Sequence, residues 1–473
     1  MVNSNIKEFL KVKQLKDKSK FKEALQIINE LENKQNFTSQ ERFEIYNLKI
    51  SLLIELGYIN EAFKYLGLLD EESRQIDDKL HFFDFFLSKC KLLLFRSEIN
   101  EAFNIINDAE QILNTIKELS SKERKEKYAS LVLLKGRYYL NMGDFERSME
   151  NAYEVLKNAK EIKNNRLILQ AVKLRCFNYS FMGDHKRALK FGNSYLELAM
   201  KANDKQEVIG ALNVLGMTLT EKEVFNQALD YLKQALSICD EIGSFKTAAV
   251  LTSLFDLYLE INNLGKAKQC LNRIKKIKNQ VDFRWFDDAF RLGKAEFLKK
   301  KPQPTAQVKA KEIFKQIVDE EGTFPEFNYV SLIHLCDLYL KELSSTNDLN
   351  VLDKLQPYLT QLKDIAIRQQ SFWLLVESYS FQAKLKLITF EFNEAQNYLK
   401  QALFTAEKYG QDRMSKQIMK EQNKLSKNLT KWERLKDIRA TLSDRMDLAR
   451  VDEQIEFLLQ KRKYIKSISI SHG

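Results

Sequence analysis

The chain has 473 residues, of which 44% are hydrophobic and 30% charged, but it contains only 14 glycines and 4 prolines. So few turn-forming residues exclude a sheet-rich fold with many short strands, while the hydrophobic content is sufficient for a large core. The formal net charge of +11 is modest for this length, and it indicates some attraction to polyanions without proving a nucleic-acid role.

One short motif recurs along the chain: an apolar residue, two polar residues and a small residue, followed by apolar positions at helical spacing. The small residues of the motif are Ala24, Ala62, Ala102, Ser148, Ala188, Ala228, Ala267 and Ala395. The first seven are separated by 38, 40, 46, 40, 40 and 39 residues. Such a regular step predicts repeated structural units of about 40 residues.

Each unit contains apolar residues at helical spacing on both sides of its small residue. Around Ala228 they include Leu215 and Leu219 before it and Leu232 and Leu236 after it. This pattern predicts two amphipathic helices per unit, joined by a short turn. Because the two backbones of such a hairpin approach closely, the contact position has room only for alanine or serine.

Local signals support this register. Capping boxes are predicted where new units begin, at Thr38 with Glu41, Ser120 with Glu123, and Thr323 with Glu326. The turn between the two helices of a unit is predicted at Gly57, Ser97, Gly143, Gly183, Glu223 and Asn262. Two units have longer turns, around residues 299–304 and 344–348, so we count about ten helical pairs in all.

The segments Gly136-x-x-Tyr139…Gly143-Asp144-Phe145 and Leu212-x-x-Leu215-Gly216…Phe225-x-x-Ala228…Ala235 resemble tetratricopeptide repeats (TPRs). The step near 40 rather than 34, and the missing closing proline, are similar to the extended units of kinesin-light-chain-like and bacterial regulator proteins. The stretch 371–379 and the region after it are also similar to uncharacterised archaeal TPR proteins. The resemblance implies an all-α, right-handed solenoid with a concave groove.

The repeat motif stops after Gly410, although the chain stays helical. We therefore expect two parts: a TPR-like solenoid over residues 1–410 and a C-terminal helical cap with a short flexible tail over residues 411–473. A cap is required because a solenoid must cover its last apolar face. The spacing of Leu448, Val451, Ile455 and Leu458 leaves a coiled-coil dimerisation element as the alternative.

Motifs for catalysis are absent from the sequence. It has no glycine-rich phosphate loop, no Gly-x-Ser-x-Gly and no His-Glu-x-x-His, so we expect no enzyme, no cofactor and no metal site. The five cysteines are scattered and predict reduced, buried thiols. Without a signal peptide or a long apolar run, we expect a cytoplasmic protein that does not insert into a membrane.

A binding function is therefore expected on the inner wall, which the resemblance places on the first helix of each pair. The wall positions are Asn47, Lys91, Arg137, Lys173, Phe177, Asn213, Met217, Asp256 and Lys384. Their basic, amide and apolar groups suit an extended or helical peptide, particularly an acidic one. The plain alternative is a solvated face without a ligand. The two-carboxylate clamp of other TPR proteins is not predicted, because its Lys and Asn residues are not matched here.

The function favoured by the sequence is a non-enzymatic adaptor or scaffold that holds a protein or peptide segment. One alternative is a nucleic-acid-associated protein that uses a basic patch; its residues are Lys275, Lys276, Lys278, Lys299, Lys300 and Lys301. Aromatic residues do not alternate with these lysines, which favours solvated helix faces instead. A second alternative is a peptide-sensing regulatory TPR protein. The oligomeric state is not predicted.

Overall fold

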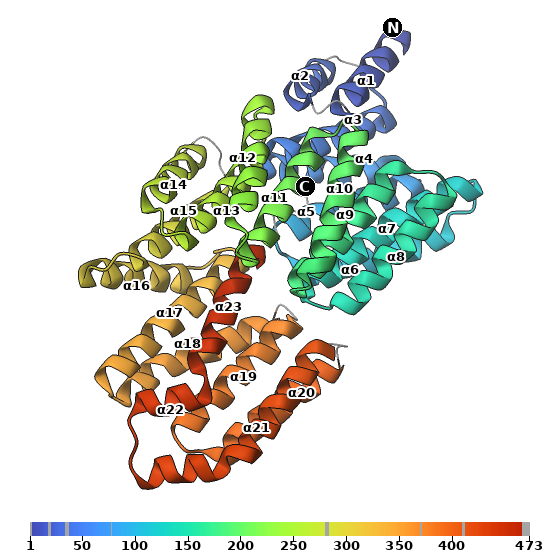
Figure 1. Ribbon diagram of the computed structural model, residues 1–473. Coiled ribbons are helices and arrows are strands. Elements are labelled where there is room, and N and C mark those ends of the chain that lie inside the picture. The colour runs from blue at the N-terminus through green and yellow to red at the C-terminus, as the bar shows by residue number, and fades with distance from the viewer. Residues whose placement is uncertain are drawn as a thin grey trace. The chain divides into compact units, whose positions relative to one another are not determined.

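The computed structural model describes residues 2–17, 20–33, 37–76, 78–279, 283–368, 371–408 and 412–465. Within these ranges the chain forms helices and no strand (Figure 1). The described residues form two compact units. Unit 1 consists of residues 2–138 and 148–293, apart from the gaps given above. Unit 2 consists of residues 139–147 and 294–465, with the same exception. The division of the chain at residue 410 stays a prediction.

Unit 1 contains α1 to α6, most of α7 and α8, α9 to α14, and the first part of α15. The bounds are α1 Val2–Asp17, α2 Phe21–Glu32, α3 Ser39–Leu56, α4 Ile59–Ile76, α5 Lys79–Phe95, α6 Ile99–Thr115, α7 Ser121–Met142, α8 Phe145–Glu161, α9 Asn165–Phe181, α10 His185–Lys201, α11 Lys205–Glu221, α12 Phe225–Ile242, α13 Thr247–Glu260, α14 Leu264–Lys278 and α15 Arg284–Lys299. Consecutive helices pack in pairs, and each pair packs on the next, as in α9 to α12. The predicted hairpin solenoid is confirmed.

Close helix contacts explain the small residues of the motif. Ala228 on α12 is fully buried. A Cβ atom added to Gly216 on the facing helix α11 would lie 2.5 Å from Cγ of Leu232 and 3.3 Å from the carbonyl oxygen of Ala228. In the α7–α8 hairpin, the buried Ser148 donates a hydrogen bond of 2.8 Å to the carbonyl of Gly136. The two backbones therefore leave no room for larger side chains here.

The six predicted turn positions all have a left-handed backbone. Their φ angles are 79° for Gly57, 59° for Ser97, 71° for Gly143, 69° for Gly183, 60° for Glu223 and 56° for Asn262. This conformation is free of steric cost for glycine and unfavourable for residues with a Cβ atom. The geometry of the turn is thus constant, while its sequence varies.

Replacing Glu223 with glycine is therefore expected to raise the free energy of unfolding by about 1 kcal/mol, because it removes the Cβ strain of a left-handed residue. Urea unfolding followed by circular dichroism measures the change. Glu223→Ala is the control, since it removes the same carboxylate but keeps Cβ. Equal stabilisation by both variants would mean that loss of the charge, not relief of backbone strain, is responsible.

Aromatic side chains join distant pairs within unit 1. The ring of Phe95, at the end of α5, lies 6.2 Å from that of Phe245 and 5.6 Å from that of Phe283, measured between centroids. A Cβ atom on Gly57, after α3, would lie 2.9 Å from Cβ of Phe245. The turn of the second pair and the end of the first helix of the third pair therefore contact residues that flank the seventh pair.

Unit 2 contains residues 139–147, the end of α15 and the remaining helices. The bounds are α16 Pro304–Asp319, α17 Pro325–Thr346, α18 Asn350–Arg368, α19 Phe372–Ile388, α20 Phe392–Lys408, α21 Asp412–Asp437, α22 Leu442–Ala449 and α23 Val451–Ile465. Helix α21 packs on α20, as expected of a cap, and the chain then returns so that α23 lies beside α17 and α19 (Figure 1). The predicted tail lies outside the described residues.

The C-terminal segment buries three of the four residues of the coiled-coil alternative, and the fourth, Leu448, is half-buried. Val451, Ile455 and Leu458 are each at most 4% exposed, because α23 packs inside unit 2. They are unavailable for a partner helix, so the coiled-coil alternative is wrong. Trp432 on α21 is likewise buried, at 2% exposed.

Two of the three predicted capping boxes are present. Thr38 and Glu41 bond reciprocally, as do Ser120 and Glu123. The box at Thr323 is wrong: α17 begins one residue later than that motif requires, its N-cap is Phe324, and the Thr323 hydroxyl donates to the carbonyl of Glu320 instead.

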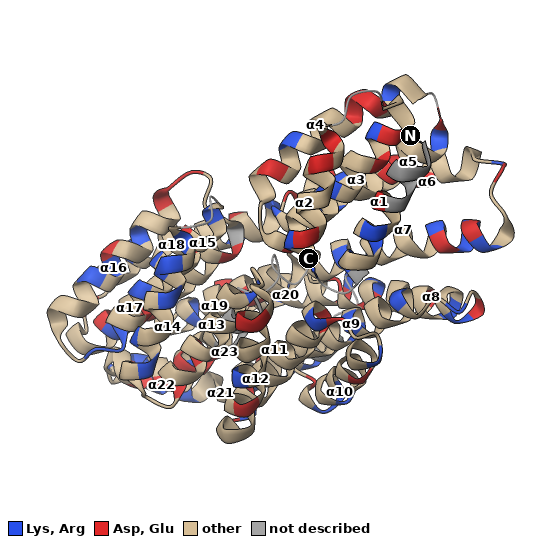
Figure 2. Cartoon of the chain, turned by 90° about the horizontal axis from the view of Figure 1, so that it is seen from above, with Lys and Arg blue, Asp and Glu red and all other residues tan. Residues whose placement is uncertain are grey.

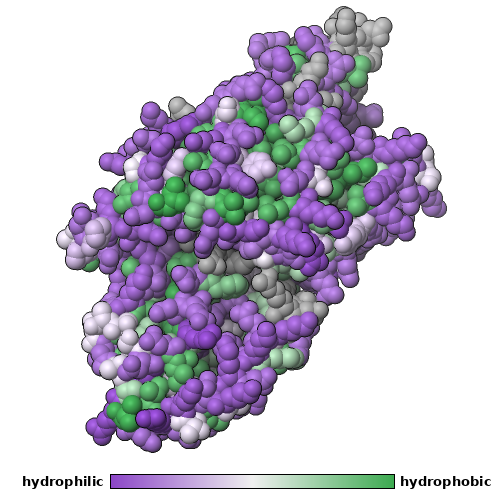
Figure 3. Space-filling model, in the orientation of Figure 1, coloured by the Kyte–Doolittle hydropathy of each residue, from purple (hydrophilic) through white to green (hydrophobic). Residues whose placement is uncertain are grey.

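The described helices include none that is both long and apolar enough to span a bilayer. On the face shown in Figure 3, hydrophilic residues predominate and apolar residues are interspersed among them. The apolar side chains of the helices lie mainly in the core instead, as the amphipathic pattern predicts.

Candidate functional site

Five basic residues and one buried carboxylate of unit 1 form a linked group of charges, and we call this group the cationic cluster. It consists of Lys91 on α5, Arg137 on α7, Arg166 and Lys173 on α9, Lys246 just before α13, and Glu207 on α11. Each member lies within electrostatic reach of at least one other member, although up to 155 residues separate them in the sequence. Lys91, Arg137, Lys173 and Glu207 lie on the first helices of four successive pairs. Arg166 lies two turns before Lys173 on α9.

Glu207 is held by several donors. Its side chain is 10% exposed and lies 3.3 Å from the Lys173 ammonium, measured from Oε2 to Nζ. Gln170 donates a hydrogen bond of 2.9 Å to Oε1, and the buried hydroxyl of Tyr195 donates to Oε2. Arg137 joins the network through a hydrogen bond of 2.7 Å to the amide oxygen of Gln170.

The charges of the cluster shift one another's pKa values. Burial alone would raise the pKa of Glu207, but the nearby Lys173 and Lys246 and the hydrogen bonds outweigh it and lower that pKa to about 2. Burial lowers the pKa of Lys173 to about 8, despite the attraction of Glu207. Glu207 therefore stays ionised at neutral pH, and one carboxylate is shared among several cations.

Lys91 and Arg166 are the two accessible cations of the cluster. Both side chains are exposed, and neither forms a hydrogen bond or ion pair with another described residue. Desolvation by the surrounding protein, together with the nearby charges of Arg166 and Arg137, lowers the pKa of Lys91 to about 8. The accessible positive charges of Lys91 and Arg166 would therefore attract an anionic ligand and bind it by charge-assisted hydrogen bonds.

The other predicted wall residues of unit 1 are less open. Asn47 is half-buried and accepts a hydrogen bond of 2.7 Å from Ser88. Asn213 donates to the sulfur of Met217, at 3.6 Å. Phe177, Met217 and Asp256 are buried, at 7%, 3% and 2% exposed. Their role in binding a partner stays a prediction.

Lys384 belongs to unit 2, where it lines a cavity beside the C-terminal helices. The sequence placed it on one wall with Lys91, Arg137 and Lys173, but those three are residues of unit 1.

The predicted basic patch is divided between the units. Lys275, Lys276 and Lys278 belong to unit 1, and Lys299, Lys300 and Lys301 belong to unit 2. Lys278 pairs with Asp287, and Lys299 pairs with Asp337 at 2.5 Å while its side chain is only 12% exposed. Figure 2 shows residues of both signs interspersed along the helices. Binding of a polyanion by this patch stays a prediction.

Other reactive side chains are packed into the cores. All five cysteines are buried, as predicted, and burial raises the pKa of Cys90 and of Cys176 to about 12, which disfavours the nucleophilic thiolate. The buried His334 bonds to Glu296 at 2.9 Å and to Lys299 at 2.9 Å. Among the described residues, no group of three or more His, Cys, Asp or Glu side chains is arranged to hold a metal ion.

Sequence reasoning found Lys91, Arg137 and Lys173 but missed Arg166, Lys246 and the acidic centre Glu207. Glu207 follows the N-cap Asp204 by three residues, so it looked like an ordinary acidic residue in a first helical turn. Arg166 also lies in a first turn, at the start of α9. Only the stacking of successive pairs shows that these helix starts face the wall.

Comparisons with known proteins bear on the fold. No family model matches this chain, and no curated protein matches it in sequence. Among solved structures, a Rap protein complexed with competence and sporulation factor aligns with 78% of this chain and 99% of that chain, at 15% identity and a TM-score of 0.55. Aspartyl phosphate phosphatase F from Bacillus subtilis covers 78% and 96%, at 14% identity and a TM-score of 0.46.

A third solved structure is a signal transduction ATPase (STAND) protein with a tetratricopeptide repeat sensor from Pyrococcus horikoshii. It aligns with 93% of this chain and 72% of that chain, at 15% identity and a TM-score of 0.37. The chain thus has the all-α fold of TPR-like helical repeat proteins, which confirms the resemblance drawn from its motifs. The similarity to uncharacterised archaeal proteins stays a prediction.

Proposed function

We propose that the protein is a non-enzymatic adaptor that binds an acidic peptide segment at the cationic cluster of unit 1. The observation that carries this proposal is the pair Lys91 and Arg166, which are exposed and make no ion pair with another described residue. A peptide carboxylate at this place gains charge-assisted hydrogen bonds, the strongest kind available to it.

The buried members of the cluster give the site its shape. Glu207 neutralises Lys173 and orders Gln170, which in turn holds the guanidinium of Arg137 at 2.7 Å. Side chains that are already fixed lose little conformational entropy when a ligand arrives. The fold also suits a ligand, since the Rap protein of similar fold was solved in a complex with competence and sporulation factor.

Charge reversal at the two exposed cations tests the proposal. Fluorescence anisotropy of a labelled glutamate-rich decapeptide measures binding to the full chain. Lys91→Glu or Arg166→Glu is expected to weaken binding at least about tenfold, because each loses an attractive contact and adds a repulsive one. The buried Lys173 is unsuitable for this test, since its reversal would place two like charges beside each other in the core.

Lys190→Glu is the matched control, because Lys190 is an exposed lysine on the second helix α10. It makes the same change in net charge and is expected to leave binding within about twofold. A glutamine version of the decapeptide should bind weakly. If a single-stranded RNA of equal charge displaces the labelled peptide as well as unlabelled acidic peptide does, the result would support nucleic-acid binding and contradict the peptide proposal.

A further inference from the structure

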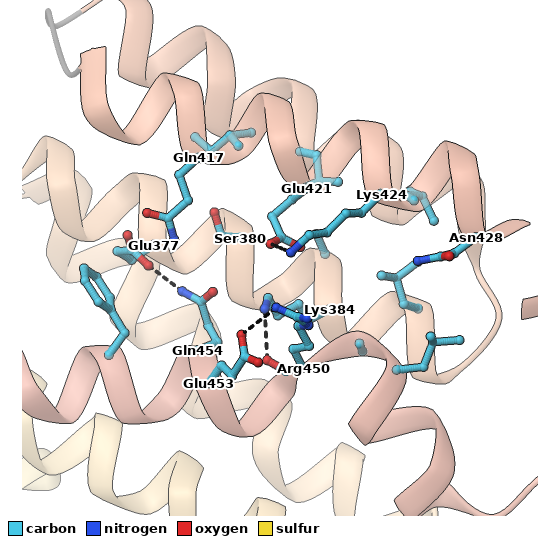
Figure 4. A pocket seen from close by; sticks show the side chains of 18 of the residues that line it. Glu377, Ser380, Lys384, Gln417, Glu421, Lys424, Asn428, Arg450, Glu453 and Gln454 are labelled. Carbon is cyan, nitrogen blue, oxygen red and sulfur yellow. Dashed lines mark hydrogen bonds and ion pairs between the residues drawn. The ribbon is translucent and has the colours of Figure 1, made fainter. Parts of the chain in front are cut away.

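A cavity of about 540 Å³ lies in unit 2, between α19 and the returning C-terminal helices α21 to α23 (Figure 4). This volume is in the range of sites for small organic ligands. Its residues are separate from the cationic cluster of unit 1. The cavity is thus a second, independent place for a ligand.

Lys384 is the buried cation of this cavity. It is 7% exposed, and its Nζ donates a hydrogen bond of 2.9 Å to the backbone carbonyl of Arg450. Among the described residues, the bond to Arg450 is the interaction that Nζ makes, and no carboxylate forms an ion pair with it. An ammonium group has three N–H donors, so this bond uses one of them.

Nearby carboxylates are engaged with other side chains, as Figure 4 shows. Glu421 pairs with Lys424 at 3.4 Å, and Glu453 pairs with Arg450 at 3.2 Å. Burial lowers the pKa of Lys384, although Glu421, Glu453 and Glu377 act to raise it. The ammonium of Lys384 is therefore incompletely compensated, and an added anion would stabilise it.

The remaining lining of the cavity is mixed: it has apolar and cationic side chains, the carboxylate of Asp447, and uncharged polar side chains such as Gln417 and Asn428. Leu387 on α19 and Leu425 and Trp432 on α21 supply buried apolar surface. Lys424 and Lys431 are exposed and place positive charge where solvent reaches the cavity. A ligand that suits Lys384 and this apolar surface carries a negative charge at one end and an apolar body.

We propose that this cavity binds a small organic carboxylate with an apolar body. Its carboxylate accepts hydrogen bonds from Nζ of Lys384, and its body packs against Leu387, Leu425 and Trp432. The exposed lysines attract the anion as it enters. This site does not depend on peptide binding at the cationic cluster.

Isothermal titration calorimetry of the full chain with octanoate tests the proposal. Octanoate is expected to bind the natural protein, and Lys384→Met is expected to weaken it at least about tenfold by removing a charge-assisted hydrogen bond while keeping the volume of the side chain. The neutral probe 1-octanol should bind weakly to both proteins. Lys400→Met, an exposed lysine on α20, is the matched control and should bind octanoate normally.

A second variant keeps the test decisive if Lys384→Met is poorly folded by circular dichroism. Ala383→Met adds volume at a buried position of the cavity wall and should weaken both probes. The proposal would be overturned if octanoate did not bind, or if Lys384→Met bound octanoate as tightly as the natural protein does. It would also be overturned if 1-octanol bound as tightly as octanoate. Lys91→Glu should leave octanoate binding unchanged, so failure of this site and failure of the peptide site are distinguishable.

Discussion

Replacing Ala228 with leucine is expected to lower the free energy of unfolding by about 3 kcal/mol, because the α11–α12 contact has no space for three more carbons. Ala228 is fully buried, and its carbonyl oxygen would lie 3.3 Å from a Cβ atom at Gly216. The helices must separate, and each pair contacts mainly its neighbours in a stacked array. We therefore expect a broadened unfolding transition as well as a lower midpoint.

Urea unfolding followed by circular dichroism measures both effects. Gln227→Leu is the matched control, because it introduces the same side chain at the neighbouring, exposed position of α12. It should change the free energy of unfolding by no more than about 0.5 kcal/mol. A transition for Ala228→Leu as sharp and as late as that of the natural protein would contradict the close contact between the two helices.

Glu207→Gln is expected to cost about 3 kcal/mol at pH 7, because it leaves the ammonium of Lys173, only 4% exposed, without its carboxylate. The pH dependence follows from the pKa of Glu207, which is about 2 in the folded state against an ordinary 4.5. A carboxyl group with a lowered folded pKa contributes stability above its unfolded pKa and loses it as the pH falls toward the folded value. The stability difference between natural protein and variant should thus narrow between pH 4.5 and pH 2.

Chemical unfolding at several pH values, with hydrogen exchange of α9 to α11, measures this effect. Glu197→Gln is the control, since Glu197 pairs with Lys201 at 2.7 Å on an exposed helix face. Loss of that pair should change the free energy of unfolding little, because solvent screens an exposed ion pair. A pH-independent difference, or an equal cost for the two variants, would show that the charge of Glu207 does not stabilise unit 1.

The hairpin register could be predicted because it rests on local constraints. The small residue at Ala228 and the left-handed turn at Glu223 follow from the geometry of one helical pair, and the sequence near each site contains the signal. Local sequence patterns also have a limit, which the wrongly predicted capping box at Thr323 shows. Phe324 competes for the N-cap position, and a pattern of two polar residues cannot tell which residue starts the helix.

The candidate site was predicted only in part. Lys91 and Arg137 each lie 11 residues before the small residue of their pair, and Lys173 lies one turn earlier, 15 residues before Ala188, so the repeat register places all three on first helices. Glu207 and Arg166 lie in first helical turns, where charged residues are common on exposed surfaces. Their inward direction depends on how one pair stacks on the next, which no local pattern encodes.

The sequence by itself determined the class of this protein: helical pairs of about 40 residues, their small contact positions, their turns and the need for a C-terminal cap. These follow from periodicity and from backbone sterics, which act over a few residues. The tertiary structure decided which charges meet and which stay accessible. It gathers Lys173, Tyr195 and Glu207 from three helices, and it turns α23 back beside α17 and α19 to enclose the cavity at Lys384. Those outcomes depend on packing between distant segments, because burial and electrostatic contact are set by the whole environment of a side chain.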